Sequence, residues 1–365
     1  MRFGFILTNL AGGGAEKAVL NIAAGLAERG HRAELIVLEQ VVVHALPAAI
    51  GFHPLAREGR KISKGWLGKR LAARRLAGLL RELAREAPFD LLVSTLPFAD
   101  EVAIAAGAPA LRCRIANTLS AEVARLAASD AAKAARRLAR YRRLYDGRAL
   151  IAVSAGVADD LRTGIGLGRA DIEVIANPFD LAAMKTLAAA PAGLPRAPYV
   201  IHVGRFSAQK RHDLLLDAFA RLDSRLRLVL LTDEEAGLRA LIAARGLAGR
   251  VEVAGFQQNP FPWIAAANLL VLCSDHEGLP NVIIEALALG VPVVSTDCPS
   301  GPREILGQAL PDCLVPIGDA AALAAAMART LAKRPEVARV DLSRYTKERV
   351  LAAYEQLAQA APRRA

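Results

Sequence analysis

The sequence has few cysteines, few aromatic residues and no long uncharged apolar run. Its four cysteines show no CxxC spacing, which argues against a disulfide framework or a zinc site and favours reduced thiols. Aromatic residues make up 5% of the chain, too few for the stacking platforms of an RNA-binding module. The longest apolar candidate, Val282–Val294, is too short for a bilayer-spanning helix and contains Glu285, so we expect no transmembrane segment.

The remaining composition is that of a folded protein. Of 365 residues, 53% are hydrophobic and 23% are charged, which is enough apolar material for about two domain cores. The first residues, Met1–Leu7, carry one basic residue and run directly into a glycine-rich turn. This pattern differs from that of an export signal, so we expect no export.

The net charge of +11 is concentrated in two segments of the first half of the chain. Residues 57–86 contain ten basic and three acidic residues, and residues 133–148 contain seven basic and one acidic residue. Their natural partners are a polyanion or an anionic membrane surface, with an ordinary solvated face as the plain alternative. Trp66 and Leu67 lie among the cations of the first segment, as in interfacial helices, which favours the membrane surface over nucleic acid.

Short apolar stretches alternate with longer Ala- and Leu-rich helical stretches along the chain. Two rounds of this alternation predict two doubly wound α/β domains, each a parallel sheet covered by helices on both faces. Three prolines in Leu187–Pro198 place the domain boundary there. Ligands of such sheets bind at the carboxyl ends of the strands, so we expect a site in a cleft between the domains. The predicted strands are Phe3–Leu7, Ala33–Leu38, Leu91–Ser94, Leu111–Ala116, Leu150–Ser154 and Ile172–Ile175, then Tyr199–Val203, Leu226–Leu231, Val251–Ala254, Leu269–Cys273, Val291–Ser295 and Cys313–Val315.

Three glycines, Gly12, Gly13 and Gly14, follow the first predicted strand and precede an amphipathic helix that runs to about Arg29. Glycines at such a turn let the backbone approach a ligand closely and leave helix N-terminal N–H groups for an anion. Their spacing is neither GxGxxG nor a Walker A loop, which argues against a dinucleotide site or a P-loop. An ordinary tight turn is the alternative.

The second domain begins with a strand that is followed by Gly204, Arg205 and Lys210. Two cations at the carboxyl end of a strand suit a diphosphate, and a solvated basic loop is the alternative. Further along, Glu277 in a turn and Glu285 in the following helix are separated by seven residues. The pair can hold a sugar near the turn, phosphates over the helix N-terminus and a ribose at the second glutamate. A paired structural carboxylate is the alternative for Glu285 alone.

The chain resembles, over nearly its whole length, the retaining glycosyltransferases of family 4, which have the two-domain GT-B fold. The most specific carrier is the E-x7-E element from Glu277 to Glu285 with Gly278, Pro280 and Asn281 inside it. Within the family the sequence is most similar to the bacterial cell-envelope branch, which builds lipopolysaccharide or lipid-linked oligosaccharides. The other carriers are Gly12–Glu16, Val153–Val157, Val174–Pro178, Val203–Arg205 with Lys210, and Val253–Phe256.

The resemblance implies roles for individual residues. Arg205 and Lys210 would bind the donor diphosphate and stabilise the leaving group, and Glu277 would contact the transferred sugar. Glu285 would bind the ribose hydroxyls. Asn117 stands where many relatives carry a histidine, so we assign it no role. The remaining donor-binding residues would be Gly13, Gly14, Gly255, Phe256, Gly278, Leu279, Pro280, Asn281, Val282 and Ile283.

The resemblance also implies a reaction and a location. We expect a hexose-type unit to pass from a nucleotide-diphosphate sugar, with UDP the commonest nucleotide in this branch, to a lipid-linked or lipopolysaccharide acceptor, with retention and without a metal or cofactor. Residues 1–187 would bind the acceptor, residues 198–340 would bind the nucleotide sugar, and residues 341–365 would form a helix crossing back to the first domain. The enzyme would be cytoplasmic and peripheral on the inner face of the membrane, held there by residues 57–86 and 133–148.

Two other classes remain open from the sequence. A GT-B enzyme could hydrolyse, epimerise or phosphorolyse a sugar instead of transferring it. A protein without enzymatic activity could use the basic segments to bind a polyanion.

Overall fold

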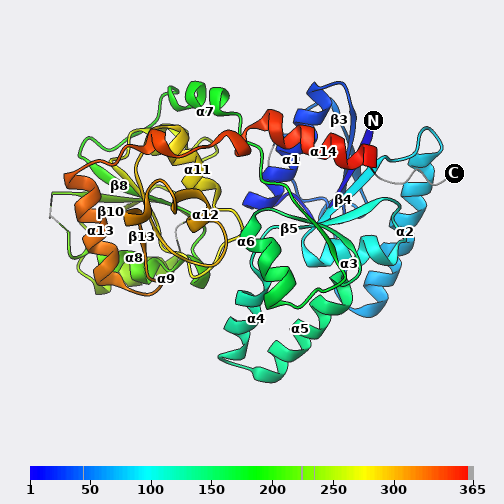
Figure 1. Ribbon diagram of the computed structural model, residues 1–365, viewed down its shortest axis with the longest axis horizontal. Helices are drawn as coiled ribbons and strands as arrows, with labels where there is room; N and C mark the ends of the chain where they lie inside the picture. Colours follow the sequence, from blue (N-terminus) through cyan, green and yellow to red (C-terminus); the bar gives the residue numbers. More distant parts are fainter. Residues whose placement is uncertain (44, 223–224, 234, 361–365) are drawn as a thin grey trace. The chain divides into compact units, whose positions relative to one another are not determined.

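The computed structural model describes residues 1–43, 45–222, 225–233 and 235–360, which form two compact units (Figure 1). Unit 1 comprises Met1–Pro178 together with the chain from Arg344 onward, and unit 2 comprises Phe179–Ser343. The chain thus enters unit 2 earlier than the proline-rich stretch suggested. The reason is that helix α7 (Leu181–Ala188) packs on α10 (Phe261–Ala265) of unit 2.

Unit 1 is built on a parallel sheet. Its described strands number seven and follow the order β3-β2-β1-β4-β5-β6-β7. The central strands are almost entirely buried, as expected for a sheet covered on both faces. Six of the strands were predicted, and β3 at the edge was not. Their bounds are β1 Arg2–Leu7, β2 Arg32–Val37, β3 Ile50–Pro54, β4 Leu91–Thr95, β5 Leu111–Ile115, β6 Ala149–Ala152 and β7 Asp171–Val174.

Helices cover both faces of the unit 1 sheet. On one face, α1 (Gly14–Glu28) and α14 (Lys347–Ala360) pack on a core that includes Phe5 and Tyr354. Figure 1 shows α14 lying beside α1, and Arg29 pairs with Glu355 at 2.8 Å between them. On the other face, α2 (Trp66–Ala84) and α3 (Pro97–Ala105) pack on a second core. The remaining helices are α4 Leu119–Ala127, α5 Ala131–Tyr145 and α6 Ala155–Asp159.

Unit 2 repeats this design. Six described strands form a parallel sheet in the order β10-β9-β8-β11-β12-β13. The two sheets confirm the predicted pair of doubly wound α/β domains. The strands are β8 Tyr199–Val203, β9 Arg227–Leu231, β10 Val251–Val253, β11 Leu269–Leu272, β12 Val293–Thr296 and β13 Leu314–Val315; the further helices are α8 His212–Phe219, α9 Ala236–Ala244, α11 Asn281–Ala288, α12 Pro302–Leu306 and α13 Ala320–Ala332.

Two observations bear on the membrane and redox expectations. Among the described residues, no helix combines the length and the apolar character needed to cross a bilayer. All four cysteines are buried free thiols. Cys113 lies in unit 1, and Cys273, Cys298 and Cys313 lie in unit 2.

Candidate active site

The central feature of unit 2 is an ion pair between Lys210 and Glu277. Lys210 ends a short 3-10 turn after β8, and Glu277 follows β11. These two strands are parallel neighbours, so their carboxyl ends lie at the same edge of the sheet. The Lys210 Nζ lies 2.6 Å from Glu277 Oε1. The structure thus brings together two of the three residues to which the sequence assigned catalytic roles.

Several contacts hold the Glu277 turn in place. The Ser274 hydroxyl donates a hydrogen bond to Glu277 Oε1 at 2.6 Å, and the Glu277 N–H donates to the Pro299 carbonyl at 3.1 Å. The Gln209 side chain donates to the His276 carbonyl at 2.7 Å. One carboxylate oxygen therefore accepts from both a cation and a hydroxyl, an arrangement that fixes its position.

The turn from Gly278 to Pro280 is also seated against Gly301. Gly301 has φ +98°, a conformation that favours glycine, and a Cβ added there would collide with the Pro280 ring. Helix α11 begins at Asn281, directly after this turn. The first N–H groups of α11 therefore lie next to the Glu277 turn, and Gly301 was not singled out from the sequence.

Both glutamates of the E-x7-E element are buried. Glu277 is 8% exposed and Glu285, within α11, is 9% exposed. Leu279 and Ile283 are buried with them, while Asn281 and Val282 are partly exposed. A buried carboxylate requires polar partners, so this element carries more polar character than a packing helix needs.

Two histidines lie beneath the Lys210 turn. His202 of β8 and His212 of α8 are buried with their rings 4.8 Å apart and nearly perpendicular. The His202 Nδ1–H donates to the Val271 carbonyl at 2.9 Å. Burial lowers the pKa of His202 well below its usual range, and burial together with the Lys210 charge lowers the pKa of His212 to about 4. Both rings are therefore neutral near pH 7.

Arg211 supplies a second ionic cluster beside the first. Its guanidinium contacts both oxygens of Asp213 and lies 2.9 Å from Asp275 Oδ1, and these hydrogen bonds raise the pKa of Arg211. Its backbone is left-handed, with φ +49°, between the 3-10 turn and α8. Sequence reasoning missed Arg211, although it directly follows Lys210.

The other predicted residues of unit 2 lie outside this cluster. Arg205 is exposed, and within the described ranges it takes part in no ion pair. Gly255 has φ +75° at the end of β10, the edge strand, and the Phe256 side chain is 55% exposed beside it. The strand β9 separates β10 from β8, so Gly255 and Phe256 form a separate open turn at the sheet edge.

In unit 1 the glycine loop follows β1, an inner strand between β2 and β4. Gly12 has φ +98°, and Gly13 caps the N-terminus of α1, whose first residue is Gly14. The Glu16 carboxylate lies against Gly13, where any added side chain would collide with it. A carboxylate stabilises a helix N-terminus, so an incoming phosphate would have to displace Glu16 from this position.

Glu39, at the end of β2, holds this loop and was missed by sequence reasoning. It is buried, accepts a hydrogen bond from the Ile62 N–H at 2.9 Å and lies 3.4 Å from the Asn9 side-chain amide. Leu10 pairs with the backbone of Val41 and Val43. The loop is thus fixed to the segment after β2 and to the chain that leads into α2.

The Asn117 side chain makes a contact within its own turn. The Asn117 side-chain carbonyl accepts a hydrogen bond from the Thr118 N–H at 3.0 Å, so it is engaged locally after β5.

In the part of the chain that the structure describes, no three acidic, cysteine or histidine side chains converge as metal ligands would.

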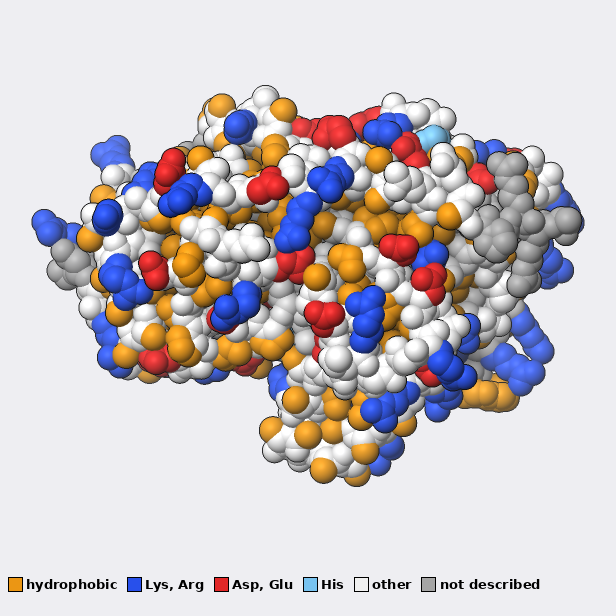
Figure 2. Space-filling view, viewed as in Figure 1, with side chains coloured by type: hydrophobic (Ala, Val, Ile, Leu, Met, Phe, Trp, Pro, Cys, Tyr) orange, Lys and Arg blue, Asp and Glu red, His pale blue; other side chains and the backbone are white. Residues whose placement is uncertain are grey.

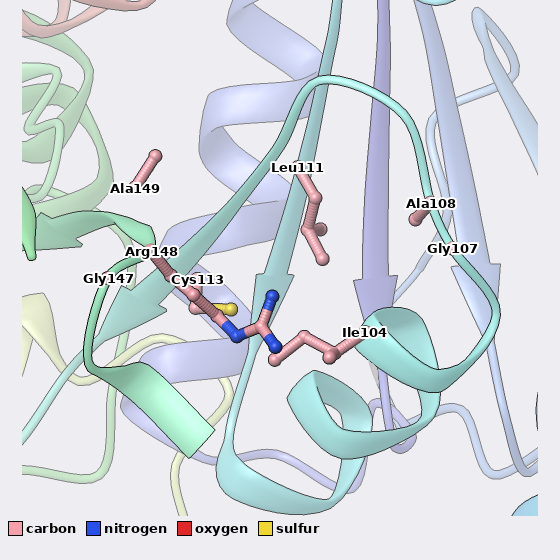
Figure 3. Close-up of a pocket in the computed structure, with 8 residues that line it drawn as sticks. All are labelled: Ile104, Gly107, Ala108, Leu111, Cys113, Gly147, Arg148 and Ala149. Atoms are coloured by element: carbon pink, nitrogen blue, oxygen red, sulfur yellow. The ribbon is translucent and has the colours of Figure 1, made fainter. Parts of the chain in front are cut away.

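A pocket of about 260 Å³ lies in unit 1, away from the glycine loop (Figure 3). Its lining includes Leu111 and Ala149, the first residues of β5 and β6, with Arg148 and Ile104. The amino ends of parallel strands form the edge opposite their carboxyl ends. The pocket therefore lies on the far edge of the sheet from Gly12–Gly14, and it is not part of the predicted donor site.

Two doubly wound parallel-sheet units place this protein in the GT-B class of enzyme folds. The family model described as Glycosyltransferase Family 4 matches residues 12–183, and the model described as Glycosyl transferases group 1 matches residues 197–333. The chain therefore belongs to this family of glycosyltransferases.

Individual relatives agree with the family models. The chain is 34% identical over 157 residues to the N-acetylgalactosamine-N,N'-diacetylbacillosaminyl-diphospho-undecaprenol 4-alpha-N-acetylgalactosaminyltransferase of Campylobacter jejuni, a match covering 42% of this chain and 43% of that protein. It is 35% identical over 175 residues to a lipopolysaccharide core biosynthesis glycosyltransferase of Rhizobium meliloti, covering 46% and 51%. The chain thus spans about half or less of the length of these curated relatives.

A solved structure supports the same fold. HepE from Anabaena, in complex with UDP and glucose, superposes with a TM-score of 0.69 over 99% of this chain and 100% of that chain. The sequences are 20% identical, so this likeness supports the fold alone.

Proposed function

We propose that the protein is a retaining glycosyltransferase of cell-envelope glycan synthesis. It moves a hexose-type unit from a UDP-sugar to a lipid-linked or lipopolysaccharide acceptor, and needs neither a metal nor a cofactor. Unit 2 binds the donor and unit 1 the acceptor. The family, the activities named for the Campylobacter and Rhizobium relatives and the UDP in the Anabaena structure support this proposal.

The observation that supports this proposed function most directly is the Lys210–Glu277 pair at the carboxyl ends of β8 and β11. A nucleotide sugar brings both a diphosphate and sugar hydroxyls. Lys210 can neutralise the first, and Glu277 can accept hydrogen bonds from the second. The N–H groups at the start of α11 add donors for a developing negative charge.

In the proposed reaction the bond between the anomeric carbon and the diphosphate oxygen breaks, and the leaving diphosphate takes the electron pair. The acceptor hydroxyl oxygen bonds to the anomeric carbon on the same face, and its proton passes to the leaving phosphate. Lys210 stabilises the charge that develops on the diphosphate, which is where electrostatic catalysis is most effective. Glu277 holds the sugar in position for the transfer.

The experiment is a thermal-shift panel of nucleotide sugars, followed by acceptor screening with cell-envelope lipid extracts. We expect one UDP-sugar to stabilise the protein, and the product to keep the donor's anomeric configuration by NMR. An inverted product would contradict retention. Donor hydrolysis without acceptor stimulation would contradict transfer.

The acceptor side of the proposal involves the two basic segments, which unit 1 brings together. Glu101 of α3 pairs with Lys69 of α2 at 2.5 Å and with Arg140 of α5 at 2.6 Å. The two cationic helices therefore flank the same helix, and Figure 2 shows Lys and Arg side chains gathered over this part of unit 1. Trp66 and Leu67, at the start of α2, are 69% and 73% exposed.

Exposed apolar side chains among cations are the composition of an interfacial helix. We propose that this surface docks unit 1 on the anionic leaflet that carries the acceptor, at the inner face of the cytoplasmic membrane. Flotation with vesicles of defined lipid composition tests this. Failure to bind anionic vesicles at low salt would contradict the docking. It would not bear on the transfer reaction, which the donor and acceptor assays test separately.

A further inference from the structure

Arg114 is a charged residue in the interior of unit 1. It stands near the carboxyl end of β5 and is only 1% exposed. Its Nη2 donates a hydrogen bond to Asn177 Oδ1, while Nε and Nη1 have no hydrogen-bond partner within the described residues. No ion pair of the described chain includes Arg114. A buried cation without a carboxylate costs free energy, and an apolar side chain of similar volume would avoid that cost.

The guanidinium lies between the two chain segments that connect unit 1 to unit 2. Asn177 is the penultimate residue of unit 1 before the chain passes into unit 2 after Pro178. Tyr354 belongs to α14, on the segment by which the chain returns to unit 1 at Arg344. Burial raises the pKa of Tyr354 and the neighbouring Arg114 opposes that rise, while the Tyr354 hydroxyl has no hydrogen-bond partner within the described residues.

The rest of the Arg114 surroundings are rigid. The Arg114 carbonyl accepts a hydrogen bond from the Thr95 hydroxyl at 3.1 Å, and the residue pairs with Ile151 in the sheet. Tyr354 is fully buried and packs edge-on against Phe5 of β1, with ring centroids 6.5 Å apart. The guanidinium is therefore anchored on central strands and reaches outward to both connecting segments.

We infer that Arg114 is a positioning residue of the transfer reaction, which holds the segment leaving unit 1 on the sheet through its hydrogen bond to Asn177 and lies beside Tyr354 of the returning segment. This inference rests on the proposed function, since transfer requires a donor on unit 2 to meet an acceptor on unit 1. The hydrogen bond to Asn177 fixes the position at which the chain leaves unit 1. Small errors in the alignment of two reactants reduce the rate strongly, by as much as about a hundredfold for a displacement of 1 Å.

The planar fork explains why this position holds an arginine. Its N–H donors point in fixed directions from one plane, so Nη2 can bond the Asn177 amide oxygen while the charged plane stays beside Tyr354. A lysine has the charge and three N–H donors on a single nitrogen but no planar fork, and a methionine has the volume but no donor. Comparing arginine, lysine and methionine at position 114 therefore separates the effects of charge, side-chain volume and planar donor geometry.

The test compares Arg114→Met with Arg114→Lys and with the control Arg112→Met. Arg112 lies two residues away on the same strand and pairs with the exposed Asp171 at 3.0 Å. We expect Arg114→Met to keep or raise the Tm, to lower kcat about 10- to 100-fold and to leave the donor KM within twofold. Arg114→Lys should not restore kcat, and Arg112→Met should leave it unchanged.

Hydrogen exchange provides a readout that does not depend on activity. In Arg114→Met we expect faster amide exchange at residues 174–178 and in α14, and unchanged exchange in unit 2. Unchanged exchange in both segments, or a kcat loss accompanied by an equal loss of stability, would overturn the inference. A wild-type protein that transfers no sugar would instead contradict the proposed function, and the exchange experiment would still decide the role of Arg114.

Discussion

Lys210 and Glu277, 67 residues apart in sequence, form a 2.6 Å ion pair because β8 and β11 are parallel neighbours. Without a donor, each neutralises the other. In the proposed reaction, an arriving diphosphate would compete with Glu277 for the Lys210 ammonium, and the sugar hydroxyls would then offer Glu277 new partners. The pair is thus arranged to exchange an internal contact for two contacts with the substrate.

Lys210→Met should slow transfer by about 10²- to 10³-fold, because it removes a cation aimed at the charge of the leaving group. Steady-state kinetics with the UDP-sugar found in the thermal-shift panel measures this. Lys185→Met, at an exposed position of α7, is the control and should keep the wild-type rate. A wild-type rate in Lys210→Met would show that Lys210 does not act on the leaving group.

Glu277→Gln should have opposite effects on binding and on catalysis. The amide can keep its contact with the Ser274 hydroxyl but no longer holds Lys210 by charge, so UDP should bind several-fold more tightly. Transfer should nevertheless slow by at least tenfold, because the sugar loses its charged acceptor. Calorimetry with UDP and kinetics with the complete donor separate the two effects. Weaker UDP binding would show that Glu277 organises Lys210 and does not compete for it.

The sheet strands were largely predictable, since buried parallel strands are nearly continuous apolar runs. All twelve predicted strands are present, and β3 was missed because Ile50–Pro54 contains glycine, histidine and proline and lies at the edge of the sheet. Strand β12 begins at Val293 and not at Val291, because the Val291 N–H still bonds to Ala286 in α11. The compact units divide at Pro178 and not within Leu187–Pro198, because α7 packs on α10 of unit 2, a tertiary contact that prolines do not report.

The site was predictable only as a set of positions along the chain. Lys210 stood out as one of two cations after a predicted strand and Glu277 as the first residue of the E-x7-E element, but their contact depends on the strand order. The same holds for Glu39 with Asn9 and for Arg114 with Asn177, whose pairing follows from the sheet and not from any local pattern. Residues of this kind carry no periodic signal by which they could be found.

Gly301→Ala should destabilise unit 2 by more than Gly318→Ala. Both glycines have positive φ, so each alanine incurs roughly 1 kcal/mol of backbone strain. Only Gly301 would in addition collide with Pro280, because no atom lies within 4 Å of a Cβ at Gly318. Urea unfolding measures both losses, and donor binding should fall only in Gly301→Ala. Equal losses would show that the Pro280 contact is relaxed without cost.

Asp100 should make the stability of unit 1 fall as the pH rises. The carboxyl is fully buried and accepts hydrogen bonds from the Ser94 and Tyr145 hydroxyls at 2.5 and 2.7 Å. Burial raises its pKa to about 7, and Glu101 adds to the rise. The folded state therefore holds the proton more tightly than the unfolded chain. The stabilisation that this bound proton gives the folded state is complete below about pH 4 and is lost by about pH 7. It amounts to on the order of 4 kcal/mol of unfolding free energy.

Asp100→Asn isolates this effect, since its amide is never charged. The difference in unfolding free energy between wild type and variant should change steadily from pH 4 to 7 and level off above it. Asp233→Asn, at an exposed position of unit 2, should give a flat difference. A flat difference for Asp100→Asn as well would mean that its carboxyl keeps an ordinary pKa.

Docking on an anionic leaflet should depend on salt through the cations of α2 and on apolar burial through its first turn. Replacing the exposed Arg74 and Arg75 with serine should weaken vesicle binding roughly thirtyfold at low salt, at about 1 kcal/mol for each cation. The effect should vanish in high salt, where charges are screened within a few ångströms. Trp66→Ser should weaken binding at least tenfold at either salt concentration, because apolar burial is not screened.

Arg221→Ser, at an exposed position of unit 2, is the control for a positive charge removed outside α2 and should bind vesicles like wild type. If Arg221→Ser weakens binding as much as the α2 substitutions do, the attraction follows the total charge and α2 is not a docking helix. If vesicles of neutral lipid bind equally well, the cations have no part in it. A helix that lies in the interface, with Trp66 buried and its cations at the headgroups, requires that only the α2 substitutions weaken vesicle binding. The effect of the arginine substitutions must then depend on salt, and the effect of Trp66→Ser must not.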